Sequence, residues 1–379
     1  MSASSLSYIE LSQKNLEHNL LAFRSLAKEG TSFAFAIKGN AYGHGQNEIA
    51  QMAEKHVDYF LVNSIEELRL LRKVSKKPTF VLGYILPELL SEAIQLGCIL
   101  GIFSVTQFSE LEKVASSAGK MQEVHIACDA LLGREGFQEG ELSSVFTIAK
   151  ECPHIKITGM YGHFANIEDT TDFSHAQKQI DAYERMQKIA AVAGYSDLKT
   201  HISATSGLLS YEKDTGKNPI IRLGVGAYGM WPSETLQRQY GKKGFELLPV
   251  LSWKTHVAQV KVLQSGLTVG YGLSYKTQRE TRTALIPQGY ADGFPRSLSN
   301  CGMVLIGGRR CPVIGRVSMN MFVVDATNVP EMKEGDEVVI IGGQGDKNIT
   351  AQEVAERSNT INYEATTRIS AILPRIIVM

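Results

Sequence analysis

The sequence lacks an excess of charge of either sign. Its 379 residues include 39 Lys and Arg and 39 Asp and Glu, so the formal net charge is +0 and the pI is about 7.1. Nucleic-acid-binding proteins normally concentrate basic residues on one face. We therefore expect no nucleic-acid partner, and we expect the ligands to be small molecules.

Long hydrophobic runs and paired cysteines are also absent. The longest apolar stretches, such as residues 98–103, are far shorter than the ~20 residues that cross a bilayer, and residues 1–13 show no basic segment followed by an apolar run. The five cysteines are scattered and form no C-x-x-C motif, so neither a disulfide framework nor a zinc site is indicated. We expect a cytoplasmic protein with reduced thiols, without a bound metal or a membrane partner.

The first 230 or so residues alternate short apolar runs with amphipathic stretches, a pattern typical of βα units around a parallel sheet. Leu16, Leu20 and Phe23, for example, recur at helical spacing. About eight such units match a (β/α)8 barrel of the TIM type, although an open doubly wound sheet gives much the same pattern. The candidate strands are 32–37, 58–63, 79–82, 99–103, 123–128, 156–161, 199–203 and 220–225.

After residue 233 the pattern changes to strand-like segments separated by glycine-rich turns, which predicts a second, mainly β domain. We expect domains at 1–235 and 236–379. One late helix is predicted from residue 350, where Thr350 and Glu353 have the spacing of a capping box. The candidate strands are 253–263, 281–288, 303–306, 311–314, 320–326 and 337–341.

The most informative local motif is F-A-F-A-I-K-G-N-A-Y-G-H-G at residues 33–45. In a parallel barrel an apolar strand is buried on both faces, and the residue that ends it emerges at the C-terminal rim, where barrel active sites lie. Lys38 has this position. A partly desolvated lysine can serve as a Schiff-base nucleophile. A lysine that merely extends into solvent is the alternative, but the nearby Tyr42 and the glycines of the motif favour a ligand site.

This segment resembles the cofactor-lysine signature of the alanine racemases, a family of pyridoxal-phosphate (PLP) enzymes, whose usual form is K-A-N-A-Y-G-H-G; only Gly39 departs from it. Further blocks similar to the family follow in the family's order, so the resemblance covers nearly the whole chain. These blocks are V-G-Y-G-L-S-Y at 269–275, Q-G-Y-A-D-G-F-P-R at 288–296, P-V-I-G-R-V-S-M at 312–319 and T-I-N-Y-E at 360–364.

The resemblance implies an N-terminal barrel, a C-terminal β domain and a homodimer with active sites shared between subunits. It also implies that Lys38 holds PLP and that Lys38 and Tyr271 of the partner subunit are the two acid/base groups. Two groups make chemical sense, because racemisation removes a proton from one face of Cα and delivers one to the other face.

The resemblance assigns further residues to the cofactor and the substrate. Arg222 is expected to face the pyridine nitrogen, which should stay unprotonated because a guanidinium does not give up its proton. The phosphate hydroxyl is either Thr205 or Ser206, and a helix cap is the structural alternative for both. The cofactor set is Lys38, Tyr42, His163, Thr205, Ser206, Arg222, Gly224 and Val225, and the substrate set is Arg134, Met319 and Tyr290.

The sequence departs from the family at several positions. Ala127 stands where many relatives have a lysine that orients the arginine matching Arg134, so something else must hold that arginine. Asn320 replaces the aspartate that usually follows the methionine matching Met319. Ala371 replaces a tyrosine that normally narrows the pocket, which suggests as an alternative a serine racemase or one of broader specificity.

Two other classes of protein share parts of this pattern. Related barrel-plus-β enzymes decarboxylate amino acids with PLP, but they place a glutamate opposite the pyridine nitrogen and a cysteine across the site, where this sequence offers Arg222 and Tyr271. A PLP-carrier protein has a related single barrel. A second domain that carries Tyr271 and Met319 argues against it, because a carrier needs no second acid/base group.

Overall fold

The computed structural model describes residues 5–168, 170–210 and 218–379. Eight parallel strands close into a barrel, which confirms the predicted barrel and excludes the open sheet. Each predicted barrel strand matches an observed one to within a few residues, whereas the predicted strand 253–263 of the second domain is two strands in the structure, Leu251–His256 and Gln259–Leu263. The barrel strands are β2 (Ser32–Ala36), β3 (Tyr59–Val62), β4 (Thr79–Val81), β5 (Ile99–Ile102), β6 (Gln122–Ala127), β7 (Ile155–Tyr161), β8 (Lys199–His201) and β9 (Asn218–Leu223).

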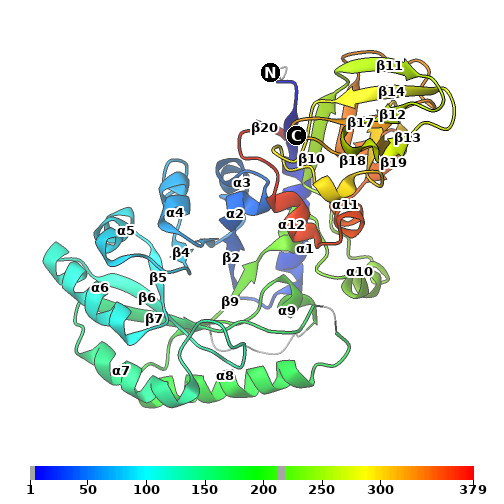
Figure 1. Ribbon diagram of the computed structural model, residues 1–379. Helices are drawn as coiled ribbons and strands as arrows, with labels where there is room; N and C mark the ends of the chain where they lie inside the picture. Colours follow the sequence, from blue (N-terminus) through cyan, green and yellow to red (C-terminus); the bar gives the residue numbers. More distant parts are fainter. Residues whose placement is uncertain (1–4, 169, 211–217) are drawn as a thin grey trace.

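Helices surround the barrel strands (Figure 1). The predicted apolar face of the first helix is confirmed, since Leu16, Leu20 and Phe23 are buried, and Ser12 caps the helix by accepting from Asn15 N. The helices of this half are α1 (Gln13–Leu26), α2 (Lys38–Tyr42), α3 (Gln46–Ala53), α4 (Ile65–Leu71), α5 (Leu90–Leu96), α6 (Val105–Ala118), α7 (Leu142–Lys150), α8 (Ser174–Val192), α9 (Thr205–Ser210) and α10 (Glu234–Gly241).

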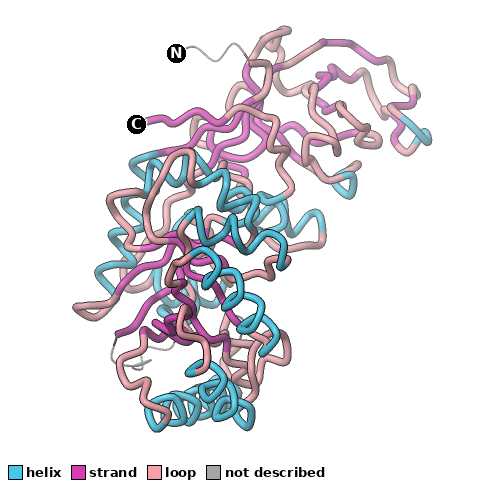
Figure 2. The backbone as a smooth tube through the Cα atoms, turned by 90° about the vertical axis from the view of Figure 1, so that its left-hand side faces the viewer, coloured by secondary structure: helices cyan, strands magenta, loops and turns pink. Residues whose placement is uncertain are grey.

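The rest of the chain forms a strand-rich lobe at one end of the molecule (Figure 2). Its main sheet runs in the order β11-β14-β17-β16-β15-β18-β10-β1-β20, and β19 pairs with β18. The strands are β10 (Leu251–His256), β11 (Gln259–Leu263), β14 (Thr281–Ile286), β15 (Met303–Ile306), β16 (Arg309–Ile314), β17 (Phe322–Asp325), β18 (Glu337–Gln344) and β19 (Lys347–Ile349).

Two strands from the ends of the described chain complete this sheet. The strand β1 (Tyr8–Ser12) pairs antiparallel with β10 and parallel with β20 (Arg375–Val378). The sequence analysis did not predict β1 or β20. The β1 strand precedes the barrel in sequence but belongs to the sheet of the other lobe, so the expected domain boundaries stay a prediction.

The lobe also carries the predicted late helix, α11 (Ala351–Ser358), and Thr350 Oγ1 accepts from Glu353 N as expected. A second helix, α12 (Asn362–Thr367), follows it and packs against α2 of the barrel half. A short hairpin of β12 (Thr268–Val269) and β13 (Tyr275–Lys276) projects from the lobe. Within the described residues, no helix has the length and apolar character that crossing a bilayer requires.

Candidate active site

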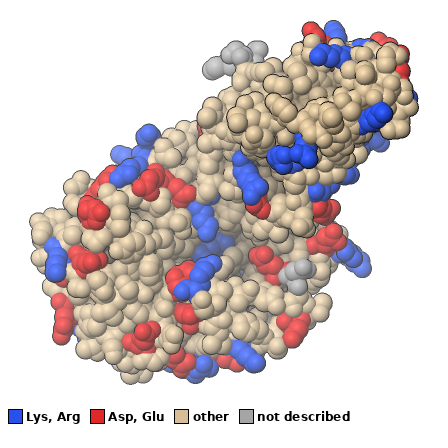
Figure 3. Space-filling model, in the orientation of Figure 1, with Lys and Arg blue, Asp and Glu red and all other residues tan. Residues whose placement is uncertain are grey.

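A cavity of about 440 Å³ lies at the C-terminal side of the barrel, between the segments that follow β6, β7 and β8. It is lined by Arg134, His163, Glu168, Ser206 and neighbouring residues. Figure 3 shows a hollow between the barrel and the lobe with basic side chains inside it. The strand ends thus place the predicted Lys38, Arg134, His163, Thr205 and Arg222 around one mouth, where barrel active sites lie.

Lys38 follows β2 directly, and strand alternation explains its direction. Ala34 and Ala36 face the barrel interior, and Lys38 is the next residue of the same parity. Its side chain is open to the mouth, but the surrounding protein removes part of its hydration. This desolvation lowers the pKa of Lys38, and the positive charges of Arg134 and Arg222 lower it further. The pKa shift favours the neutral, nucleophilic amine.

The segment after Lys38 is a left-handed turn. Gly39, Asn40, Ala41 and Tyr42 have φ of 61°, 54°, 53° and 53°. Each non-glycine residue in this conformation costs about 1–2 kcal/mol, so the turn stores strain of the kind found at functional sites.

Contacts from other elements hold this turn in place. Glu67 on α4 accepts from Gly39 N at 2.6 Å, and Asn40 Oδ1 accepts from Gln46 N at 3.0 Å. Arg375 Nη2 donates to Gly43 O at 2.8 Å from the far end of the chain. The sequence analysis missed Glu67 and Arg375, because nothing near Lys38 in sequence indicates them.

Gly43 must be glycine for two reasons. Its φ is +84°, and a Cβ built there would lie 1.9 Å from the carbonyl oxygen of Thr366 in α12. Only a residue without a side chain lets the loop approach the lobe this closely. Gly43 therefore lies at the contact between the barrel half and the lobe.

Arg222 lies in β9 and is buried. Its Nη1 donates to His201 Nδ1 at 2.9 Å, and its Nη2 donates to Gly162 O at 2.7 Å and to His163 Nδ1 at 3.2 Å. Burial lowers the pKa of Arg222 to about 10, so it stays charged at neutral pH. Among the described residues none accepts from its Nε, so this donor has no protein partner there.

The hydrogen bond from Arg222 fixes the protons of two buried histidines. A guanidinium has no acceptor, so His201 Nδ1 must accept and its proton must be on Nε2. His201 Nε2 then donates to His125 Nδ1 at 2.8 Å. Burial lowers the pKa of His125 to about 3 and that of His201 well below its ordinary value, so both are neutral. They hold the arginine without neutralising its charge.

Glycines make room for these rings inside the barrel. A Cβ at Gly159 would lie 2.3 Å from the His125 ring, and one at Gly101 would lie 2.5 Å from the hydroxyl of Tyr161. Tyr161 in turn stacks on His201 with ring centroids 5.1 Å apart. His125 is not among the predicted site residues, although its inward parity on β6 is a usable signal.

His163 follows β7 at the mouth. Burial, together with the charges of Arg222, Arg134 and Lys38, lowers its pKa to about 3. Its Nδ1 accepts from Arg222, so its proton is on Nε2. A neutral imidazole held in this way is suited to pack against a planar ring without adding charge.

A second cluster of polar groups lies where the sequence predicts phosphate binding. The Gly224 amide donates to Thr205 Oγ1 at 3.0 Å, and the Tyr42 hydroxyl lies 3.1 Å from the position of a Cβ on Gly224. Val225 follows at the start of a buried 3-10 turn. Ser206 is directed differently, because its hydroxyl donates to Glu168 at 2.8 Å. The geometry thus distinguishes the two hydroxyls that the sequence left open.

Arg134 is held by its sequence neighbour. Its guanidinium makes two hydrogen bonds to the Glu135 carboxylate, one from Nε and one from Nη2 at 2.8 Å. Ala127, at the position of the family lysine, is buried and has no polar group to offer. Glu135 therefore supplies the carboxylate that holds Arg134, a contact that the sequence analysis did not foresee.

Tyr271, Tyr290 and Met319 lie together on the lobe. Ala291 N donates to Met319 O at 2.9 Å, and Tyr290 N donates to Ser318 O at 3.1 Å, so the two loops are joined. The turn of Tyr271 packs on the same region, since a Cβ at Gly270 would lie 3.5 Å from Arg316 N. Tyr271 is 72% exposed, and these side chains are not among those that line the 440 Å³ cavity of their own chain.

Comparisons with known proteins agree with this arrangement. The model of the alanine racemase N-terminal domain matches residues 11–232, and that of the alanine racemase C-terminal domain matches residues 250–377. An alanine racemase of Leptospira interrogans is 33% identical over 378 residues, covering 98% of this chain and 96% of the relative. One of Symbiobacterium thermophilum is 32% identical over 370 residues, covering 97% and 96%.

Two solved structures are similar over almost the whole chain. The alanine racemase from Bacillus anthracis with bound L-Ala-P has a TM-score of 0.93 and 29% identity, and the match covers 100% of this chain and 96% of that one. The alanine racemase from Bartonella henselae with covalently bound pyridoxal phosphate has a TM-score of 0.85 and 26% identity, with coverage of 99% and 100%.

Proposed function

The chain belongs to the alanine racemase family and is a racemase, and from this we propose that it interconverts L- and D-alanine with PLP held at Lys38. The observation that carries the proposal is the barrel mouth itself. It combines an amine of lowered pKa at Lys38 with a buried, charged Arg222 that has one donor to spare.

The residues present fit this cofactor. Lys38 Nζ would hold it covalently, and the Nε of Arg222 is the donor suited to its pyridine nitrogen. Thr205, Tyr42 and the Gly224–Val225 turn would hold the phosphate. Because the Gly224 amide already donates to Thr205 Oγ1, the hydroxyl hydrogen of Thr205 is available to an anion. Bound PLP would draw electrons from the substrate Cα and so make its proton acidic.

The remaining chemistry is a proton exchange between two groups on opposite faces of Cα. We assign Lys38 Nζ to one face, since its lowered pKa keeps a fraction of the amine able to accept a proton. We assign the hydroxyl of Tyr271 of the partner subunit to the other face. Arg222 cannot release a proton at neutral pH, so it would leave the pyridine nitrogen of a bound cofactor unprotonated, which would favour simple proton exchange over other reactions.

A shared site requires a second copy of the chain, and the exposed lobe residues support a homodimer. Tyr271, Leu273, Met319, Tyr290 and Met321 are 72%, 70%, 56%, 45% and 45% exposed although they are large and apolar. Such exposed groups mark interaction surfaces. A two-fold symmetric contact would bring this surface to the partner's barrel mouth and the partner's surface to this one.

At the substrate end, Arg134 would bind the carboxylate of the amino acid, with the backbone amide of Met319 and Tyr290 of the partner subunit beside it. Glu135 would keep the guanidinium in position while leaving its outer edge free. We place the working enzyme in the cytoplasm, where free amino acids and PLP are available.

A solvent-exchange experiment tests the function. Purified protein with PLP and L-alanine in deuterated water should give D-alanine, followed by chiral chromatography, with deuterium at Cα of the product. Tyr271→Phe should lower kcat for both directions by about a hundredfold or more, as expected for loss of an acid/base group. Full activity in Tyr271→Phe contradicts the two-base assignment, and release of carbon dioxide would indicate a decarboxylase instead.

Serine is the second candidate substrate. Ala371 lies in the turn between α12 and β20, and the neighbouring Ser370 N donates to Asp292 O at 3.0 Å. The shortened side chain therefore adjoins the turn that carries Tyr290. If the space serves a larger substrate, kcat/KM for L-serine should equal or exceed that for L-alanine, and Ala371→Tyr should restore preference for alanine. A strong alanine preference of the unaltered protein rules out the serine assignment.

A further inference from the structure

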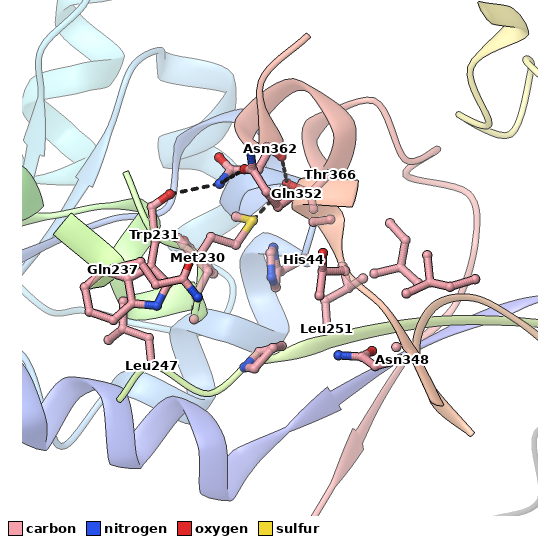
Figure 4. A pocket seen from close by; sticks show the side chains of 18 of the residues that line it. His44, Met230, Trp231, Gln237, Leu247, Leu251, Asn348, Gln352, Asn362 and Thr366 are labelled. Atoms are coloured by element: carbon pink, nitrogen blue, oxygen red, sulfur yellow. Dashed lines mark hydrogen bonds between the residues drawn. The ribbon is translucent and has the colours of Figure 1, made fainter. Parts of the chain in front are cut away.

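A second cavity, of about 240 Å³, lies between the barrel and the lobe. Figure 4 shows it, with Trp231 and Met230 on one side, Leu251 and Asn348 on the other, and His44 between them. Most of the wall is apolar, and its rim includes the exposed Glu234 and Gln237, so small molecules can reach it from outside. Among the described residues, none lines both this cavity and the 440 Å³ barrel mouth.

His44 contributes an imidazole ring to the wall of this cavity. The side chain is 1% exposed, and its Nδ1 contacts Tyr42 O at 3.1 Å. A carbonyl only accepts, so the proton must be on Nδ1 and Nε2 must carry a bare lone pair. No described residue donates to Nε2. Burial lowers the pKa of His44 to about 4, so at neutral pH the ring stays uncharged and the lone pair stays available.

Because His44 lines the cavity and Nε2 has no hydrogen-bond donor among the described residues, this atom can accept a hydrogen bond from a molecule inside the cavity. Other polar side chains also line the wall, among them Gln237, Asn348 and Asn362. The side-chain amide of Asn362, which lies close to His44 in Figure 4, already donates to Trp231 O at 2.9 Å and to Gln352 Oε1 at 3.1 Å. A ligand that donates a hydrogen bond would complement His44 Nε2. Glu234 at the rim is already paired with Arg238, so the rim offers no free carboxylate to attract a cation.

The size and the lining define the occupant further. An apolar cavity of about 150 Å³ is enough to hold benzene, so this one holds a single ring with a substituent. The His44 ring packs on Tyr228 with centroids 4.5 Å apart, and Trp231 adds a third aromatic wall. Flat, uncharged molecules match such walls.

We propose that this cavity is a binding site for a small, uncharged aromatic molecule with one hydrogen-bond donor, which His44 Nε2 accepts. The site lies next to the loop of Lys38. His44 and Lys38 belong to the same turn-rich segment, and Tyr228 packs on both His44 and Tyr42, with ring centroids 4.5 Å and 5.1 Å away. The occupant would therefore contact the segment that positions Lys38 and would join it to the lobe.

Two fluorinated probes isolate the contribution of the donor. 4-Fluorophenol and 4-fluorotoluene have similar shapes, but only the phenol has a hydroxyl. Each is titrated into the full-length protein with PLP, and binding is followed by fluorine NMR. Both should bind, with dissociation constants within about tenfold of each other, because the acceptor offsets the cost of burying the hydroxyl.

Substitution of the acceptor should separate the probes. In His44→Phe the affinity for 4-fluorophenol should fall about tenfold or more, while that for 4-fluorotoluene should change less than about threefold. An unchanged ratio of the two affinities overturns the proposal. So does failure of both probes to bind the unaltered protein, which would leave a cavity that holds water alone.

Two further measurements keep the test decisive if His44→Phe does not fold. Ala351 lines the cavity, and Ala351→Met should fill part of it and weaken both probes. The methionine methyl groups are isotopically labelled for NMR, and the resonance of Met230 is identified by its absence in Met230→Leu. This resonance should shift when either probe binds the unaltered protein. Probe binding that leaves the Met230 signal unmoved, or that survives Ala351→Met at full affinity, places the probe elsewhere and contradicts the assigned site.

Discussion

Arg134 and Glu135 are neighbours in sequence and form a two-point ion pair at the barrel mouth, with Nη2 2.8 Å from Oε1. The pair is local to one loop, so it forms without help from the rest of the fold. It answers a question that the sequence raised, namely what holds this arginine when position 127 is an alanine.

The first prediction concerns this pair. Glu135→Gln should raise KM for alanine by roughly two- to fivefold with little change in kcat, because a half-exposed ion pair contributes modestly and acts on binding. Glu139→Gln is the matched control, since Glu139 pairs with Arg185 at 2.9 Å outside the mouth. Steady-state kinetics of both variants check the prediction. An equal change of KM in the two variants would show that Glu135 has no specific role in substrate binding.

Gly43 and Gly30 offer a second matched pair. Their φ angles are +84° and +81°, but a Cβ at Gly43 would meet Thr366 O at 1.9 Å, whereas no described atom lies within 4 Å of the same position at Gly30. Gly30→Ala should cost about 1–2 kcal/mol of unfolding free energy from backbone strain alone. Gly43→Ala should cost at least about 2 kcal/mol more through the clash. Urea denaturation of both variants measures the difference. Equal losses of unfolding free energy would contradict the prediction, because they would show that the loop around Gly43 can move away from Thr366 without cost.

The third prediction separates the two candidate phosphate hydroxyls. Thr205→Val keeps the shape but removes the hydroxyl, so it should weaken PLP binding by about tenfold or more, while Ser206→Ala should weaken it less than about threefold. Thr205→Ser keeps the hydroxyl and should bind nearly as well as the unaltered protein. Equilibrium dialysis measures each dissociation constant. A larger loss in Ser206→Ala than in Thr205→Val reverses the assignment.

Buried histidines make the stability of the protein depend on pH. Burial lowers the pKa of His44 to about 4 and the pKa values of His125 and His163 to about 3. Between pH 6.5 and these values the unfolded chain binds protons that the folded chain does not, so stability falls as pH falls. Each such histidine contributes a slope of up to about 1.4 kcal/mol per pH unit. The midpoint of urea denaturation should therefore drop steeply from pH 6.5 to pH 4.5, and a flat profile contradicts the buried, neutral state.

Much of this fold could be predicted from sequence because its signals are local. Each barrel strand is a short apolar run, and the location of Lys38, His163 and Arg222 at the barrel mouth could be predicted because strand ends and motifs coincide. The strands β1 and β20 were missed because they are short, partly polar segments whose pairing depends on residues more than 200 positions away.

The parts of the site that sequence could not reveal are those made by contacts over long distances. Arg375 reaches Gly43 across 332 positions, and His125 meets His201 across 76. The parity of His125 on its strand indicates that it faces inward, but nothing in either segment indicates its partner. The choice between Thr205 and Ser206 likewise depends on which hydroxyl faces Gly224, a matter of helix rotation that the pattern does not fix.

The central claim is that Lys38 carries the cofactor, and one measurement tests it most directly. The protein is incubated with PLP, reduced with borohydride, digested and analysed by mass spectrometry. The account predicts a single stable adduct, on the peptide that contains Lys38, and none in Lys38→Ala. An adduct on a different lysine of the unaltered protein, or no adduct at all, would contradict it.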